Sequence, residues 1–191
     1  MKNMMLAAAA LGAVAAFARE YKVSAPIDAG VSSAENRPAY AAQCRKAGVQ
    51  RVFVCRGDFC RQTPAEQDES IRVIRDNLEF YREEGFEVAV WISGLGHGAP
   101  LAHETGRRTL DGLQHIIGLY SGKWAEDSFC PMDKGLVKRF VDGVSKLAAA
   151  GVPMVMIDDD LRLSLHGAAM YGCACPLHIA EFNRRAKEKK L

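Results

Sequence analysis

The sequence lacks several features that mark specialised classes of protein. Its net charge is +2, and no stripe of basic residues accompanies that charge, so the composition gives no sign of nucleic-acid binding. Beyond residue 18, no apolar run is long enough to span a membrane. What remains is 49% apolar and 25% charged over 191 residues, which is typical of a globular protein with one domain or two.

The amino terminus has the layout of a secretory signal peptide. Lys2 precedes an apolar run from Met4 to Phe17, and small residues stand at Ala16 and Ala18. We therefore expect cleavage after Ala18, export to the periplasm or the extracellular space, and a mature domain over residues 19–191. No cysteine follows the expected cleavage site to carry a lipid anchor. The alternative is an ordinary buried or frayed helix.

Three segments share one layout, in which a helical pattern ends at a glycine and a short apolar strand follows. Gly48, Gly85 and Gly151 stand where a left-handed helix cap is usual, and strand-forming runs come directly after them. With an earlier extended segment, the expected strands lie near residues 21–28, 50–56, 86–93 and 153–159. Strands that alternate with helices predict an α/β fold built on a parallel sheet.

The predicted helices carry their own start signals. Thr63 and Glu66 form a capping box around Pro64. Asp133 is expected to cap a later helix with an inward face made of Val137, Phe140, Val141, Val144 and Leu147. A last helix is expected to begin at Pro176, with Ile179 and Phe182 inward. Between these helices, HIIGLYSGKW predicts a small hairpin that turns at Ser121 and Gly122.

Polar residues follow each predicted strand, at the edge where parallel α/β folds bind ligands. Asp58 follows the second strand, His97 follows the third, and the triplet Asp158, Asp159 and Asp160 follows the fourth. The loop SGLGHGAP around His97 lacks the G-x-G-x-x-G spacing of a dinucleotide site. It is either a loop that lets His97 approach a ligand or a plain turn.

The aspartate triplet ends a core-forming segment with three like charges. Strand alternation places Asp158 and Asp160 on one face and Asp159 on the other. Paired carboxylates suit glycoside hydrolysis, and carboxylates also bind divalent cations. The alternative is a solvated strand end, or a carboxylate paired with Arg56 or Arg162.

A second cluster of reactive residues lies near the carboxyl terminus. His166, Cys173, Cys175 and His178 form H-x6-C-x-C-x2-H. These are residue types that bind zinc, although the spacing matches no standard finger. A disulfide from Cys173 or Cys175 to another cysteine, or unligated side chains, are the alternatives in an exported protein.

Longer stretches carry a resemblance to a known family. IDDDLRLSLHG and YGCACPLHIAEFN resemble a segment of bacterial glycoside hydrolases with a β-galactosidase-like TIM barrel, and GFEVAVWISGLGHGAPLAHE and SFCPMDKGLVKRFVDGV resemble the same family. The resemblance covers most of residues 20–190. It implies a (β/α)8 barrel, of which residues 19–191 would be four β/α units, or half a barrel. Where such segments carry a third cysteine, this chain has His178.

The resemblance implies that Asp158 and Asp160 are the catalytic or sugar-binding carboxylates and that no cofactor is required. Substrate contacts are then expected from Asp58, His97, Trp124, Asp159 and Arg162. A second catalytic carboxylate usually lies on a later strand, so we expect a missing carboxyl-terminal half or self-association through open sheet edges.

Two other functions stay open from the residues alone. One is a metal-dependent hydrolase, such as a deacetylase, that uses the aspartate triplet with His97 or His166. The other is a non-catalytic module that binds a glycan without hydrolysing it.

Overall fold

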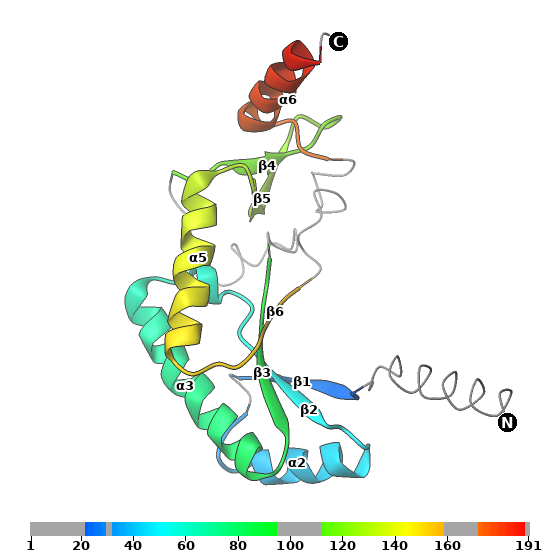
Figure 1. Cartoon of the computed structure of the whole chain (residues 1–191), viewed down its shortest axis with the longest axis vertical. Coiled ribbons are helices and arrows are strands. Elements are labelled where there is room, and N and C mark those ends of the chain that lie inside the picture. The colour runs from blue at the N-terminus through cyan, green and yellow to red at the C-terminus, as the bar shows by residue number, and fades with distance from the viewer. Residues whose placement is uncertain (1–21, 30–31, 95–111, 159–171, 190–191) are drawn as a thin grey trace, which may run out of the picture.

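A four-stranded parallel sheet forms the centre of the protein. The computed structural model describes residues 22–29, 32–94, 112–158 and 172–189. Its main sheet has the strand order β1-β2-β3-β6, with every neighbouring pair parallel (Figure 1). The strands are β1 (Ser24–Asp28), β2 (Arg51–Cys55), β3 (Glu87–Ile92) and β6 (Val155–Ile157). The predicted α/β fold with a parallel sheet is confirmed, with narrower strand bounds than expected.

Each connection between these strands contains a helix in its described part: α2 (Arg37–Lys46), η1 (Phe59–Arg61), α3 (Pro64–Glu83) and α5 (Lys134–Ala149). The capping box predicted for α3 is present. The Thr63 hydroxyl accepts a 3.3 Å bond from the Glu66 amide, and the Glu66 carboxylate accepts a 2.8 Å bond from the Thr63 amide. Asp133 caps α5 as predicted, because its Oδ1 accepts bonds from the Gly135 and Leu136 amides. These bonds satisfy amides that have no partner inside the helix.

The three predicted glycines turn the chain from a helix toward the following strand. Gly48 follows α2 with φ 71°, Gly85 follows α3 with φ 87°, and Gly151 follows α5 with φ 82°. This left-handed backbone is costly for residues with a side chain. It allows the Phe86 amide to bond back to the Tyr81 carbonyl at 3.0 Å, which closes the helix end.

The main core lies between one face of the sheet and the helices. Val52 and Val54 of β2 stand in register with Val88 and Val90 of β3, and all four are buried. The helices complete this core with Ala41, Cys44, Ile74, Leu78, Tyr81 and Leu147. Alternate residues of β2 therefore anchor the sheet, and the others point to its second face.

The inward face of α5 agrees in part with the predicted one. Leu147 is fully buried, and Phe140 and Val144 pack against the main core as predicted. Val137 and Val141 are 48% and 60% exposed, so their predicted inward placement is wrong. Gly143 is the reason, because a Cβ there would lie 2.8 Å from the Cys60 Sγ of η1. The missing side chain lets η1 approach α5 and selects a neighbouring stripe of the helix as its buried face.

A smaller unit lies at the end of the molecule opposite α2 (Figure 1). It contains the antiparallel hairpin of β4 (His115–Ile117) and β5 (Trp124–Phe129). The helix α6 (Pro176–Glu188), which comes later in the chain, lies beyond this hairpin (Figure 1). The Gly118 amide bonds to the Lys123 carbonyl at 2.8 Å, so the predicted hairpin is confirmed. The hairpin packs with α5 in a second core of Ile116, Ala125, Phe129 and Leu136.

The last helix begins at Pro176 as predicted, but it does not turn its apolar side chains inward. Ile179 and Phe182 are 46% and 67% exposed, so their predicted burial is wrong. Periodicity marks an apolar face without revealing whether another element covers it.

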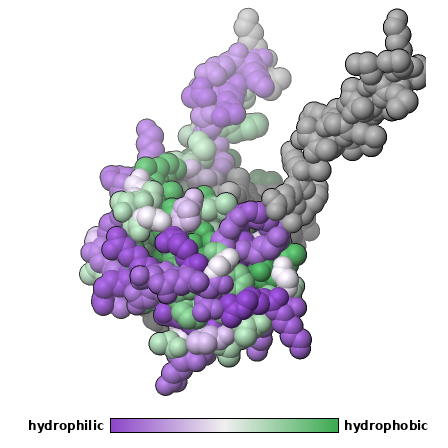
Figure 2. Space-filling view, turned by 60° about the horizontal axis from the view of Figure 1, so that its bottom comes forward, coloured by the Kyte–Doolittle hydropathy of each residue, from purple (hydrophilic) through white to green (hydrophobic). Residues whose placement is uncertain are grey.

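The surface seen from the α2 end is mainly hydrophilic, with hydrophobic side chains gathered in patches (Figure 2). Among the described helices, none combines the length and the apolar character that a membrane crossing requires.

Candidate functional site

Two aspartates stand at the carboxyl edge of the parallel sheet. Asp28 is the last residue of β1, and Asp158 directly follows β6. The Asp158 amide donates a 2.9 Å bond to the Ile92 carbonyl, which continues the pairing of β6 with β3. The predicted position of Asp158 at this edge is therefore confirmed.

Asp28 stands opposite Cys55, the last residue of β2, in the pairing of β1 with β2, whereas Asp158 lies two strands away from β2. Burial raises the pKa of Cys55 to about 11. A hydrogen bond with the Ile27 backbone lowers this pKa, whereas the negative charges of Asp28 and Asp158 raise it. The thiol stays protonated near neutral pH and is therefore not a nucleophile. The two outer strands of the sheet thus each place a carboxylate at its carboxyl edge, on either side of the ends of β2 and β3.

Asp58 is held in place by a polar network from the start of α3. Gln62 Nε2 donates a 3.1 Å bond to Asp58 Oδ1, and the buried Ser70 hydroxyl donates a 2.8 Å bond to Gln62 Oε1. Arg56 Nε donates a 3.1 Å bond to the same hydroxyl. Gln62 and Ser70 have no local sequence signal, because their role depends on how η1 folds back against α3.

The loops after β2 and β3 touch each other at this edge. The Ser93 amide donates a 2.9 Å bond to the Gly57 carbonyl. A Cβ at Gly57 would lie 2.8 Å from the Ser93 hydroxyl oxygen, so a larger residue at this position would require the Ser93 side chain to move. The contact fixes the loop that carries Asp58 relative to β3.

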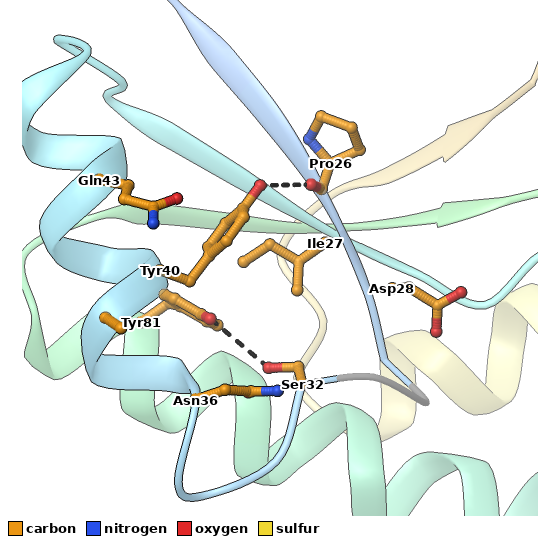
Figure 3. Close-up of a pocket in the computed structure, with 9 residues that line it drawn as sticks. Pro26, Ile27, Asp28, Ser32, Asn36, Tyr40, Gln43 and Tyr81 are labelled. Atoms are coloured by element: carbon orange, nitrogen blue, oxygen red, sulfur yellow. Dashed lines mark hydrogen bonds between the residues drawn. The ribbon is translucent and has the colours of Figure 1, made fainter.

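A pocket of about 350 Å³ opens beside Asp28, between β1 and α2 (Figure 3). Tyr40, Ile27 and Tyr81 face one another across it. The Tyr40 hydroxyl donates a 2.7 Å bond to the Pro26 carbonyl. The walls of the pocket are otherwise mostly apolar. The pocket adds an aromatic surface next to a carboxylate, which sequence reasoning did not find.

Trp124, which was also expected to contact a substrate, belongs to the hairpin and not to this edge of the sheet. Trp124 begins β5 in the hairpin, 65% exposed, and its ring meets His115 edge-on at 5.3 Å. The remaining predicted residues lie outside the described ranges: His97, Asp159, Asp160, Arg162 and His166.

A group of metal-ligand side chains lies between the hairpin and α6. Cys130, Cys173, Cys175 and His178 place their ligand atoms within 4.8 Å of one another and could hold a metal ion. The Cys130 and Cys175 Sγ atoms are 3.4 Å apart, and His178 Nδ1 lies 3.2 Å from the first and 3.4 Å from the second. Ligands around a tetrahedral zinc ion are roughly 3.5–3.8 Å apart, so the spacing is close to that of a loaded site.

Backbone pairing brings these four residues together. The Cys130 amide bonds to the Gln114 carbonyl at 2.7 Å, which fixes Cys130 at the end of β5. Cys173 bridges to Gly118 beside β4, and the chain then passes Cys175 into α6. His178 follows in the first turn of that helix.

The surroundings of the four ligands are those of a protected site. Cys130 and Cys175 are fully buried, and burial raises the pKa of Cys130 to about 12. Burial lowers the pKa of His178, so its imidazole is neutral and able to bind a cation. The Met132 amide donates to the Cys130 sulfur at 3.4 Å, which favours a charged thiolate once a cation displaces the proton.

The predicted ligand set is thus partly recovered. Cys173, Cys175 and His178 do come together, and Cys130 joins them from a distant part of the sequence. His166 lies outside the described residues. Cys130 and Cys175 each precede a proline, and this repeated Cys-Pro pair is the one sequence signal that could have linked them.

Comparisons with known proteins give no match to a family model, a curated protein or a solved structure.

Proposed function

We propose that this chain is a carbohydrate-active protein that binds a glycan at the carboxyl edge of its parallel sheet. We further propose that its four β/α units correspond to half of a TIM-type barrel. The placement of Asp28 and Asp158 at the carboxyl ends of the two outer strands, with the anchored Asp58 following β2 between them, is the observation that carries this proposal. The resemblance of IDDDLRLSLHG and its neighbours to barrel glycoside hydrolases supports the choice of a sugar.

In this proposal Asp158 and Asp160 act on the glycosidic bond. One of them serves as the acid or as the base or nucleophile, and the second carboxyl group that the reaction needs is supplied from outside these four β/α units. Asp58 and Asp28 accept hydrogen bonds from sugar hydroxyls, and the pocket beside Asp28 offers Tyr40 as a platform for a ring.

Neutralising Asp158 tests the proposal. We expect Asp158→Asn to weaken binding to an immobilised glycan panel by about 10- to 100-fold, because charge-assisted hydrogen bonds contribute about 1.5–3 kcal/mol each. Asp142→Asn is the matched control, since Asp142 is an exposed carboxylate of α5 paired with Lys138. The proposal fails if the wild-type protein binds no glycan, or if both variants bind as the wild type does.

Turnover of aryl glycosides separates an enzyme from a binding module. Hydrolysis that is lost in Asp158→Asn supports the enzyme, whereas binding without hydrolysis supports a non-catalytic glycan-binding module.

A metal-dependent hydrolase is the competing function, with an ion at the sheet edge held by the aspartate triplet and His97 or His166. Among the described residues, the group of metal-ligand side chains lies instead between the hairpin and α6. Metal analysis of Cys130→Ser distinguishes the two, because an edge-bound ion would survive that substitution.

We also propose that Cys130, Cys173, Cys175 and His178 hold a structural zinc ion. Thiolate and imidazole ligands in a tetrahedral arrangement favour zinc over oxygen-preferring cations. Four protein ligands leave no open position for a substrate, so the ion would stabilise the fold rather than catalyse a reaction.

A further inference from the structure

Within the described part of the chain, the helix α6 makes very little apolar contact with the rest of the protein. None of its residues is buried, and Leu177, Ile179 and Phe182 are all more than a third exposed. Its ion pairs run within the helix, from Arg184 and Arg185 to Glu181 and from Arg184 to Glu188. A helix of 13 residues that lacks a packed face is marginal in water.

The contacts that do attach this segment surround the thiol cluster. The Ala174 amide donates a 2.7 Å bond to the Ile117 carbonyl, and Cys173 bridges to Gly118. Cys175 is fully buried at the N-cap of α6, although its neighbour Pro176 is exposed. Attachment is therefore concentrated within a few residues of the metal-ligand atoms.

The four ligands come from separate parts of the chain. Cys130 ends the hairpin, Cys173 and Cys175 lie in the incoming strand-like segment, and His178 belongs to α6 itself. One ion bound to all four would cross-link these parts. Because the full ligand set does not exist until the segment docks, binding free energy becomes folding free energy.

We propose that zinc bound at this site docks residues 172–189 onto the β4–β5 hairpin, so that metal binding and the ordering of α6 are coupled. This inference rests on the zinc site proposed above. The main core contains no residue of α6, so we expect it to stay folded without the metal.

Hydrogen–deuterium exchange on the full chain tests this coupling. The wild-type protein is compared as purified with zinc, after chelation under reducing conditions, and after zinc is restored. We expect amides of residues 172–189 to exchange about tenfold faster or more without zinc, and to recover on reloading. Peptides from α3 should exchange equally in all three samples, because α3 packs in the main core.

Cobalt substitution reports the site separately from the helix. Co²⁺ bound to thiolates should give a strong near-ultraviolet charge-transfer band, which Cys130→Ser weakens without altering the sequence of α6. Cys44→Ala is the matched control, since Cys44 is a free thiol buried elsewhere, in the main core.

The outcomes separate the two proposals. Zinc bound at about one ion per chain, with equal α6 exchange in its presence and absence, overturns the coupling but keeps the site. Absence of zinc and of the cobalt band, or a Cys130–Cys175 disulfide in freshly isolated protein, overturns the site and the coupling together.

Discussion

Replacing Leu147 by alanine tests how α5 is turned toward the core. Leu147 is fully buried in the main core, whereas Val141 on the same helix is 60% exposed. A sequence-based reading expects both to face inward. The pair Leu147→Ala and Val141→Ala therefore distinguishes the observed orientation from the predicted one.

The expected costs follow from burial. Leu147→Ala removes the equivalent of about three methylene groups, or about 2.4 kcal/mol at about 0.8 kcal/mol each. The cavity left in a packed core raises the loss in unfolding free energy to about 3–5 kcal/mol. Val141→Ala removes about two methyl groups that are mostly in water already, a loss of about 0.6 kcal/mol. The better helix propensity of alanine offsets about 0.5 kcal/mol of that loss.

Urea unfolding followed by circular dichroism at 222 nm measures both variants against the wild type, at fixed zinc concentration. An unchanged slope against urea shows that the same transition is compared. A cost above about 1.5 kcal/mol for Val141→Ala, or below about 1 kcal/mol for Leu147→Ala, would refute the orientation of α5.

Three further predictions concern a charge, a backbone position and the leader. Burial acts to raise the pKa of Asp133, but bonds from the Gln114, Gly135 and Leu136 amides lower it overall. A lowered folded-state pKa means that this carboxylate stabilises the fold fully above the ordinary aspartate range, and that the contribution is lost as pH falls through the folded value. Asp133→Ala should therefore flatten the acid side of the stability-versus-pH curve, and an unchanged curve contradicts the cap. Gly85→Ala should lower the unfolding free energy by about 1–2 kcal/mol because φ is 87° there, as thermal melts can show; an unaltered midpoint argues against the left-handed cap. Protein recovered from an exporting host should begin after Ala18 by intact mass, and an uncleaved amino terminus rules the leader out.

Local signals account for most of what the sequence predicted correctly. The glycine after each helix and the apolar run that follows it marked the strands, because both depend on neighbouring residues. The cap at Asp133 and the box at Thr63 are also local, since each bond spans at most three residues. Asn36 shows the limit of such local signals. Asparagine is a common N-cap residue and Asn36 stands at the N-cap of α2, but its side chain accepts a bond from the Ser33 amide instead of capping the helix.

Long-range features escaped the same reasoning. Cys130 joins the metal-ligand group only because β5 ends beside the segment that begins at Gly172. The exposed faces of α5 and α6 carry correct helical periodicity, but periodicity does not reveal which stripe a neighbouring element covers. The hydrogen bonds that connect Asp58 through Gln62 to Ser70 depend on the turn made by η1. No pattern of residues in the sequence predicted that turn.

The order of the sheet bears on how easily the protein could change during evolution. Paired residues of β1 and β2 are 27 positions apart (Ser24 and Arg51), and those of β3 and β6 are 65 apart (Val90 and Val155). Loop-closure entropy grows only with the logarithm of length, at about 0.6 kcal/mol per doubling, so the longer connection costs less than about 1 kcal/mol more. The segment between β3 and β6 could therefore acquire a hairpin and a metal-ligand cysteine at almost no cost to the sheet. Because the entropic cost of a longer connection is small, that segment could also lengthen, shorten or replace its metal-ligand residue while the strands on either side keep their register.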